Sequence, residues 1–543
     1  MLPPFSPTNP FPSNRSATYA RDGMVATSQP QAAQVGRDIL SQGGNAIDAA
    51  IATAAALTVV EPTGCGLGGD AFALVWIAEH GRGGGELYGL NASGTAPEKL
   101  TCEAVKAAGH KQIPLYGWTP VTVPGAPAAW AELSRRFGRL DFSSLMAPAI
   151  RLARDGFPVS PTIATLWQRA YTEFSAQTDI NVLANWFDTF APSGSAPKAG
   201  EWHRCLDQAK TLEAIADTRA ESFYRGELSK TIDQFSQETG GYLRASDLAG
   251  YYPEWVTPIT TRYRGVDIWE IPPNGQGLVA LIALNMIQGF SPASRDNATY
   301  LHQQLEAMKL AYMDGMQHIT QIDQMTYRVE SLLSKPYAEE RRELISDTAI
   351  DPYPGVPKAG GTVYLATADS DGNMVSFIQS NYHGFGSGIV IPGTGIALQN
   401  RGHDFSLDAQ HDNVLKPGKK TFHTIIPGFL TQAGKPLGPF GVMGGFMQPQ
   451  GHVQVVMNMV DHGLNPQAAV DAPRWQWVGG KKIAVEPHFP LHLVRDMAAR
   501  GHNIYIEHDT LGFGRGQIII RDPNTGIYCG GTETRTDSSI AVL

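Results

Sequence analysis

Residues 362–380 read TVYLATADSDGNMVSFIQS and decide the fold of the chain around them. The runs TVYLATA and MVSFIQS are rich in β-branched and aromatic residues, and the sequence DSDGN between them is typical of a turn. The pattern predicts a β-hairpin. If Ala368 faces Met374 across the loop, Thr362 lies opposite Ser380 on the neighbouring strand. DSDGN lacks the further oxygen ligands and the distal Glu of a calcium loop, so we interpret it as a turn only.

Thr362 is the first residue of the hairpin and follows Gly361, the last residue of the Pro- and Gly-rich segment DPYPGVPKAGG at 351–361. We expect this segment to be a linker without regular structure. Attack of the Thr362 hydroxyl on the Gly361 carbonyl would form an ester, and its hydrolysis would free an α-amine. With an ordinary pKa of roughly 7.7–8.0, that amine could be the base for its own hydroxyl. A Gly-Gly-Thr sequence is also common at plain loop-to-strand junctions, so these residues alone leave both interpretations open.

Helical and strand patterns alternate along the rest of the chain, without an internal repeat. Two Ala-rich helices are expected within 31–60, with Asn45 as the cap of the second. A buried strand is expected at 72–78. Segments between about 125 and 250 carry apolar residues at three- and four-residue intervals, which is typical of helices. The remaining expected helices are 277–289, 298–318 and about 450–461.

Length and composition limit the class of protein. The 543 residues allow three domains or one large enzyme fold. Hydrophobic residues make up 42% and charged residues 17%, which excludes overall disorder. The net charge is −9 and no long run of Lys or Arg occurs, so nucleic acid is not an expected partner. No signal peptide and no stretch of about 18 apolar residues is found, which predicts a cytoplasmic protein without a membrane partner.

Residues 1–22 are rich in Pro, Ser and Asn and are expected to form an N-terminal tail. The cysteines lie far apart, which fits a reducing compartment better than disulfides or a zinc site. No His, Glu and Asp cluster at ligand spacing is found among the 15 histidines, so neither a metal nor an organic cofactor is expected. The four cysteines are Cys65, Cys102, Cys205 and Cys529.

Several segments together resemble the γ-glutamyltransferase family of N-terminal nucleophile hydrolases. They span about residues 23–540 and include GGNAIDAAIATAAALTVVEPTGCGLGGDAF, TVPGAPAAW, GGYLRASDLAGYYPEWVTPITTRYRG, IPPNGQG, TVYLATADSDGNMVSF and DAPRW. The resemblance implies a four-layer αββα sandwich of the α/β (α+β) class. It also implies self-cleavage into a large chain that ends at 361 (23–361 after the tail) and a small chain, 362–543. The two chains would form one αββα unit, a heterodimer whose further dimerisation is left open.

The resemblance also assigns catalytic roles. It implies that Thr362 is the nucleophile and that Ser380 supports its hydroxyl. In GPFGVMGGFMQPQ a Gly-Gly turn precedes the expected helix, and backbone N–H groups at such a turn suit an oxyanion. The family's oxyanion glycines fall on Gly444 and Gly445. GCGLGGD at 64–70 lacks the Lys-Ser/Thr ending of a phosphate loop, so we interpret it as a structural or pocket-wall loop.

The substrate pocket departs from the family pattern. Family members that bind γ-glutamyl groups hold the α-carboxylate with an Arg in a segment resembling NARETAP, and here the segment is NASGTAP with Ser93 in place of that Arg. Arg401 is a candidate substitute, because it aligns where the family has Gln or Glu beside the substrate amine. Asp404 keeps the acidic residue used for that amine. Arg401 could alternatively pair with Asp404 only, or lie on the surface.

Other pocket positions differ as well. The two serines that help bind the carboxylate in the family align with His423 and Thr424. The expected Asn aligns with Tyr382, and Asn381 lies one position away. His423 could alternatively be a hydrogen-bonded strand histidine without a role in binding.

These differences favour a small-molecule amide substrate with a short, carboxylate-bearing acyl group, such as oxamate. The expected enzyme is a self-processed threonine amidohydrolase without metal or organic cofactor. The alternatives are a γ-glutamyltransferase or glutathione hydrolase, an acylase for bulkier amides, and a noncatalytic relative that binds a carboxylate.

Overall fold

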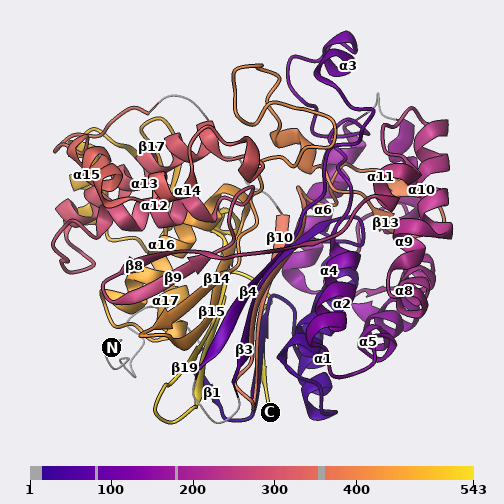
Figure 1. The fold of residues 1–543 in the computed structure, drawn as a ribbon, viewed down its shortest axis with the longest axis horizontal. Coiled ribbons are helices and arrows are strands. Elements are labelled where there is room, and N and C mark those ends of the chain that lie inside the picture. The colour runs from indigo at the N-terminus through magenta and orange to yellow at the C-terminus, as the bar shows by residue number, and fades with distance from the viewer. Residues whose placement is uncertain (1–14, 80–83, 178–180, 353–360) are drawn as a thin grey trace.

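The computed structural model describes residues 15–79, 84–177, 181–352 and 361–543. Two seven-stranded antiparallel sheets stack face to face, and helices cover the outer face of each (Figure 1). The expected four-layer αββα sandwich is therefore confirmed. Most of the expected linker at 351–361 and the first 14 residues of the expected tail lie outside the described residues.

The hairpin predicted from the sequence lies inside the first sheet, which we call the hairpin sheet. Its register is the predicted one from Val363, opposite Gln379, to Ala368, opposite Met374. The register shifts by one residue at the start, where Gly361 pairs with Tyr382. In sheet order, its strands are β21 (Ser539–Val542), β2 (Gly23–Thr27), β10 (Gly361–Asp369), β11 (Met374–Tyr382), β3 (Asp70–Ala78), β4 (Gly85–Ala92) and β7 (Glu254–Val256).

The second sheet packs against the hairpin sheet through a core to which both sheets contribute, including Phe72, Tyr364, Phe429 and Ile519. Its edge strand β1 falls within the expected tail 1–22, because Thr18–Ala20 pairs with Tyr528–Gly530. In sheet order, its strands are β1 (Thr18–Ala20), β20 (Tyr528–Thr532), β19 (Arg515–Arg521), β15 (Lys435–Met443), β14 (Gly428–Gln432), β9 (Val266–Glu270) and β8 (Ile259–Tyr263).

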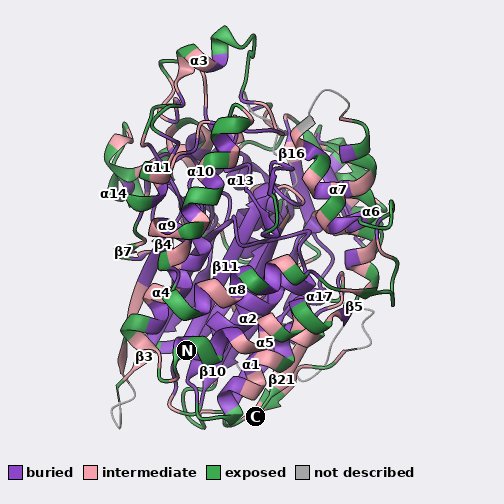
Figure 2. Ribbon diagram, turned by 90° about the vertical axis from the view of Figure 1, so that its right-hand side faces the viewer, coloured by how far each residue is buried: buried purple, intermediate pink, exposed green. Residues whose placement is uncertain are grey.

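Helices from the first half of the chain cover the hairpin sheet. The central helix α2 is buried along its whole length, and the Asn45 side chain accepts hydrogen bonds from the N–H groups of Ile47 and Asp48, as its predicted cap role requires. Figure 2 faces this layer and shows the buried strands behind it. The helices of this half are α1 (Pro30–Ser41), α2 (Ala46–Val60), α3 (Cys102–Ala107), α4 (Ala126–Phe137), α5 (Phe142–Asp155), α6 (Pro161–Ser175), α7 (Ala184–Phe190), α8 (Leu206–Thr218), α9 (Glu221–Arg225), α10 (Glu227–Glu238) and α11 (Ala245–Ala249).

Later helices cover the second sheet with a separate apolar core. The predicted helix 298–318 has the observed bounds, and the helix expected at about 450–461 begins two residues earlier. Within the described ranges, no helix has both the length and the apolar character needed to span a membrane. These helices are α12 (Gly277–Ile287), α13 (Ala298–His318), α14 (Val329–Leu332), α15 (Lys335–Glu343), α16 (Gln448–Val460), α17 (Pro466–Asp471) and α18 (Leu491–Ala499).

Three small sheets complete the fold of the described residues. The largest is three-stranded and packs beside α13 and α18. Its strands are β16 (Trp475–Gly479), β17 (Lys482–Val485) and β18 (Asn503–Ile506). The two-stranded ones are β5 (Phe157–Pro158) with β6 (Trp202–His203), and β12 (Val390–Ile391) with β13 (Ile396–Ala397).

Candidate active site

The predicted nucleophile lies at the shifted start of β10. Thr362 is 1% exposed, and its Oγ1 donates a hydrogen bond to the Gly361 carbonyl oxygen at 2.7 Å. The Ser380 Oγ lies 3.1 Å from the Thr362 Oγ1 and donates to the same carbonyl oxygen at 2.7 Å. The structure therefore brings together both hydroxyls and the carbonyl group of the predicted cleavage point.

The glycine-rich loop at 64–70 packs directly on this cluster. A Cβ atom added at Gly64 would lie 3.2 Å from the Thr362 carbonyl oxygen, and one added at Gly69 would lie 2.5 Å from that of Ser380. Larger residues at these positions would push β10 and β11 away, which explains why the sequence has glycines here. The loop forms a wall of the candidate site.

Gly444 and Gly445 follow the last residue of β15. Their φ angles are +138° and +59°, which glycine adopts readily and other residues rarely do. Gly441, three residues before this turn, lies against the ring of Tyr364, which is close to the start of β10. The end of β15 and the start of β10 therefore lie at the same end of the sandwich. The Gln276 side chain donates to the Gly445 carbonyl oxygen at 2.9 Å and fixes the turn.

Arg401 is buried in a group of polar residues that adjoins Ser380 through Asp70 and Tyr382. We call this group the acyl pocket: Arg401, Asp404, Tyr382, His423, Thr424 and Asp70. The Arg401 Nη1 donates to the Thr424 Oγ1 at 2.6 Å and lies 3.5 Å from an Asp404 carboxylate oxygen. Its Nε and Nη2 atoms are buried and make no hydrogen bond with the described residues. The surface alternative for Arg401 is thereby wrong, and two of its donor atoms remain available to a ligand.

Tyr382 connects the nucleophile to the acyl pocket. Its backbone N–H donates to the Ser380 Oγ at 2.8 Å, and its hydroxyl donates to Asp404 at 2.6 Å. Its ring lies under the Arg401 guanidinium, 4.1 Å from the Cζ atom, in a cation–π contact. Its φ angle of +77° is unusual for a bulky residue and points to a constrained functional position.

His423 is hydrogen-bonded within the acyl pocket. Its Nδ1 accepts from the Ile425 N–H, so its Nε2 carries the proton and donates to Asp70 at 3.1 Å. Burial lowers the pKa of His423 well below its usual range, and the cationic Arg401 lowers it further. The imidazole is therefore neutral. His423 is hydrogen-bonded, as its alternative interpretation expects, but it lies at an isolated bridge to Gly275 and not in a strand.

Asp70 is a site residue that the sequence analysis missed. It was included in the glycine-rich loop without a role of its own, yet it begins β3 directly opposite Ser380 and contacts His423. Burial raises the pKa of Asp70 to about 7 although Gln399 and Arg401 oppose the shift. An acidic residue at the end of a glycine loop, just before a buried strand, was the available signal.

The two remaining predicted residues lie at the pocket wall. The Ser93 hydroxyl donates to Asn91 at 2.7 Å and accepts from Asn274 at 3.1 Å, so its hydrogen bonds are internal. Asn381 points into the glycine loop, where the oxygen and nitrogen of its side-chain amide are buried without a hydrogen-bond partner among the described residues. Asn381 is therefore better placed than Ser93 to contact a ligand.

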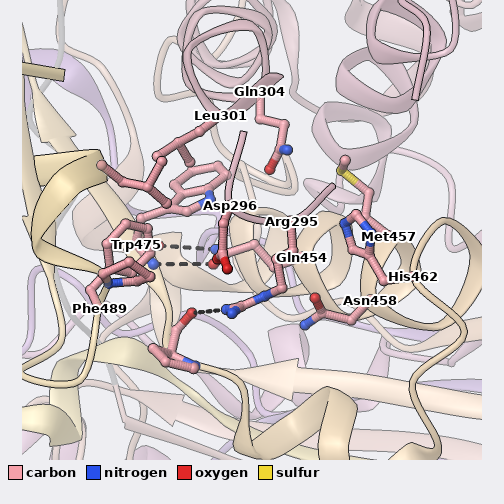
Figure 3. A pocket seen from close by; sticks show the side chains of 13 residues that line it. Arg295, Asp296, Leu301, Gln304, Gln454, Met457, Asn458, His462, Trp475 and Phe489 are labelled. Atoms are coloured by element: carbon pink, nitrogen blue, oxygen red, sulfur yellow. Dashed lines mark hydrogen bonds between the residues drawn. The ribbon is translucent and has the colours of Figure 1, made fainter. Parts of the chain in front are cut away.

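A cavity of about 610 Å³ opens beside Gly361, and no residue of the acyl pocket is among the residues that line it. An ion pair between Arg169 and Asp509, 2.9 Å apart, lies at this cavity. Its polar and aromatic lining includes Thr63, His383, Gln476, Tyr505, Glu507 and Arg515. Figure 3 shows a second pocket of only about 30 Å³ between α13, α16 and α18, with Gln454 and Trp475 hydrogen-bonded to each other, and no predicted site residue lines it.

A cluster of potential metal ligands occurs elsewhere, so the expectation that no such cluster exists was wrong. His302, Glu306 and His502 are buried with possible ligand atoms within 4.8 Å of one another. His302 and Glu306 are four residues apart on α13, a spacing that the sequence analysis overlooked, whereas His502 lies about 200 residues further along the chain. His302 and His502 are hydrogen-bonded to each other at 2.9 Å, and the Lys309 ammonium donates to Glu306 at 2.8 Å. The Glu306 carboxylate is thus already paired with a cation, the ammonium group of Lys309.

Comparison with known proteins decides the family. A model of the gamma-glutamyltranspeptidase family matches residues 32–543. The chain belongs to the gamma-glutamyltranspeptidase family. The family consists of hydrolases and transferases, and this member of it is a proenzyme amidohydrolase.

Relatives within the family carry different activities in their names. The family member is 35% identical to the glutathione hydrolase-like YwrD proenzyme of Bacillus subtilis, over 95% of this chain and 97% of the relative. It is 33% identical to the oxamate amidohydrolase proenzyme of Klebsiella pneumoniae, over 97% and 99% of the two chains. The solved structure of a cephalosporin acylase from Bacillus halodurans is 59% identical, with a TM-score of 0.94 over 99% of both chains.

Proposed function

We propose that the chain is a self-processing threonine amidohydrolase that cleaves amides of a short acyl group bearing a carboxylate, such as oxamate. The single observation that carries this proposal is the buried Arg401 guanidinium, two of whose nitrogens have no hydrogen-bond partner in the described part of the chain. A buried cation with free donors suits an anionic ligand, and a guanidinium binds carboxylates with paired hydrogen bonds.

Self-processing would begin with attack of the Thr362 Oγ1 on the Gly361 carbonyl carbon. The hydrogen bond from the Ser380 Oγ to the Gly361 oxygen polarises that carbonyl. Hydrolysis of the resulting ester would leave a large chain ending at Gly361 and a small chain beginning with Thr362, and the two would stay together as a heterodimer. The new α-amine of Thr362 would then serve as the base in each catalytic cycle.

In the amidohydrolase reaction, the Thr362 Oγ1 attacks the substrate carbonyl carbon and its proton passes through the α-amine to the leaving amine. Ser380 holds the hydroxyl in position. Backbone N–H groups at Gly444 and Gly445 would stabilise the oxyanion, as preorganised donors of this kind do in other acyl-transfer enzymes. Water then releases the acyl group from the threonine ester.

Asp404 argues against a γ-glutamyl group as the preferred acyl group. Its carboxylate already accepts from the Tyr382 hydroxyl and lies beside the Arg401 guanidinium. A substrate α-amine would have to compete with both of these donors. Together with the loss of the family's arginine at Ser93, this favours an acyl group that has a carboxylate but no amine.

The cavity beside Gly361, where the leaving amine would lie, supports a second candidate, an acylase for bulkier amides. The 610 Å³ cavity beside Gly361 has room for a much larger group than ammonia. The similarity to the solved cephalosporin acylase agrees with such a leaving group. Both candidates share the carboxylate-bearing acyl group and differ only in the amine that is released.

The test is a comparison of two anilides that differ only in the acyl group. Oxanilate and a γ-glutamyl anilide both release aniline, so kcat/KM on self-cleaved enzyme compares their acyl groups directly. We expect a clear preference for oxanilate. A preference for the γ-glutamyl anilide would contradict the proposed pocket. Oxamate itself, followed by ammonia release, then separates the small-amide candidate from the bulky-amide candidate.

A further inference from the structure

Asp70 joins the acyl pocket to the catalytic hairpin. Its Cα atom lies opposite that of Ser380 in the hairpin sheet. One carboxylate oxygen accepts from the Gln399 amide at 2.8 Å and from the Gly94 N–H at 3.2 Å, and the other accepts from the His423 Nε2 at 3.1 Å. Asp70 thus ties together four segments that form the pocket.

The buried charges of the pocket are not balanced. Arg401 and Asp70 are fully buried, and the Asp404 side chain is only 9% exposed, so this group of described residues holds one cation and two carboxylates. Lys420 lies near, but its ammonium is paired with Glu254 at 2.9 Å. A carboxylate bound to Arg401 would add a third buried anion, which is costly without a further positive charge or a proton. The charged and titratable groups that face Asp70 are His423, Arg401, Lys420, Tyr224 and Tyr251.

The neighbours of the two carboxylates differ in their ability to share a proton. Asp404 faces a phenol hydroxyl and a guanidinium, both of which keep their protons near neutral pH. Asp70 faces the neutral imidazole of His423, which brings no positive charge to keep the Asp70 carboxylate ionised, and burial raises the pKa of Asp70 to about 7. An added proton can therefore reside on the Asp70–His423 pair as a unit.

We propose that the Asp70–His423 pair takes up one proton when an acyl carboxylate binds Arg401, and that Asp70 thereby determines the preference of the pocket for singly charged acyl groups. This inference rests on the proposed function, since it concerns the same pocket. It assigns Asp70 a role in binding specificity that is separate from attack by Thr362. The unpartnered Nε and Nη2 of Arg401 are the atoms that the carboxylate would contact.

The direction of the pH effect follows from the charges. Burial raises the pKa of Asp70 to about 7, so near neutral pH the pair is partly unprotonated before a ligand binds. The protonated pair carries less negative charge and binds an anion better. Affinity should be constant below about pH 7 and should fall above it, by up to about tenfold per pH unit, until the pKa of the bound state is reached.

Pyruvate is a suitable probe, because it has a methyl group where oxamate has its amide nitrogen and therefore cannot be cleaved. We would measure its competitive inhibition constant from pH 5.5 to 9 on self-cleaved enzyme, in the wild type and in Asp70→Asn. The wild-type constant should rise above pH 7, and the Asp70→Asn constant should lack that rise. Titration of the Thr362 α-amine affects both proteins equally, so the difference between the curves reports on Asp70.

Asp207→Asn is the matched control, because it makes the same Asp-to-Asn change on a half-exposed residue that pairs with Lys210 on α8, outside the acyl pocket. Its pH curve should follow the wild type. If Asp70→Asn does not fold, calorimetric binding of pyruvate to the wild type in two buffers of different ionisation enthalpy at pH 8 should give close to one proton taken up.

Failure of the inference about Asp70 and failure of the proposed function would give different results. Identical pH curves in the wild type and Asp70→Asn, or no proton uptake, would overturn the role of Asp70 while leaving the proposed function intact. Failure of pyruvate to inhibit at any pH would overturn the proposed function and this inference together.

Discussion

Replacing Arg401 with lysine should lower kcat/KM for oxanilate by about 100-fold. The Arg401 Nη1 bonds Thr424 and lies beside Asp404, which leaves Nε and Nη2 for the substrate carboxylate. Hydrogen bonds to charged groups contribute roughly 1.5–3 kcal/mol each, so loss of two costs about 3 kcal/mol at the lower limit. Since about 1.4 kcal/mol corresponds to a tenfold change, the expected loss is about 100-fold.

Lysine keeps a positive charge for Asp404 and so limits the damage to the fold. The loss should be found mainly in KM, because the carboxylate is held equally before and during reaction. Acetanilide, whose acyl group is neutral, should be hydrolysed by Arg401→Lys and by the wild type at similar low rates.

The control is Arg264→Lys, which changes an arginine paired with Asp461 at 2.9 Å in the turn between β8 and β9. It should leave kcat/KM unchanged. Self-cleavage on a denaturing gel and the Tm would show that both variants fold. The account of the pocket would be refuted if Arg401→Lys kept its oxanilate activity within threefold, or if it lost activity toward both anilides equally.

Three further predictions concern the surrounding structure. Ser380→Ala should slow self-cleavage by about 100-fold on a gel time course, because it removes the Ser380 hydroxyl that donates to the Gly361 carbonyl. Ser380→Thr should restore the rate of self-cleavage, and an unchanged rate in Ser380→Ala would refute the role of this hydroxyl. Gly444→Ala should lower both kcat and the Tm, because a φ of +138° costs an alanine about 1–3 kcal/mol and its Cβ would lie 3.0 Å from the Gly514 Cα; wild-type values for both would contradict this. Burial would raise the pKa of Glu533, but the guanidiniums of Arg474 and Arg535 outweigh it and hold the pKa at about 2. The depressed pKa stabilises the fold above the unfolded value of about 4.3, and this stability is lost as the pH falls toward 2. Glu533→Gln should therefore lower the free energy of unfolding by about 3–5 kcal/mol at pH 7, and by progressively less in acid; a difference that stays constant with pH would contradict the ion-pair explanation.

The hairpin could be predicted because its turn is specified locally. The Asp369 carboxylate accepts from the N–H groups of Asp371 and Asn373, and Gly372 supplies the positive φ, so five adjacent residues fix the register. The shift at Gly361 could not be predicted, because it depends on packing against the glycine loop near residue 64, about 300 residues away in the sequence.

The acyl pocket was only partly predictable for the same reason. Arg401 and Asp404 are close in the sequence, and their proximity was foreseen. The contact of His423 with Asp70 joins residues 353 positions apart, and only the pairing of β3 with β11 brings Asp70 to the site. Sequence spacing carries no information about such contacts, so both the partner of His423 and the cluster of His302 with His502 became visible only in the fold.

The central claim is that Thr362 is the nucleophile released by self-cleavage. Mass spectrometry of the purified enzyme, before and after brief exposure to oxanilate, tests it most directly. The account predicts two chains divided between Gly361 and Thr362, and an oxalyl adduct on the N-terminal residue of the small chain. An active, uncleaved chain of 58.6 kDa, or an adduct on any other residue, would contradict it.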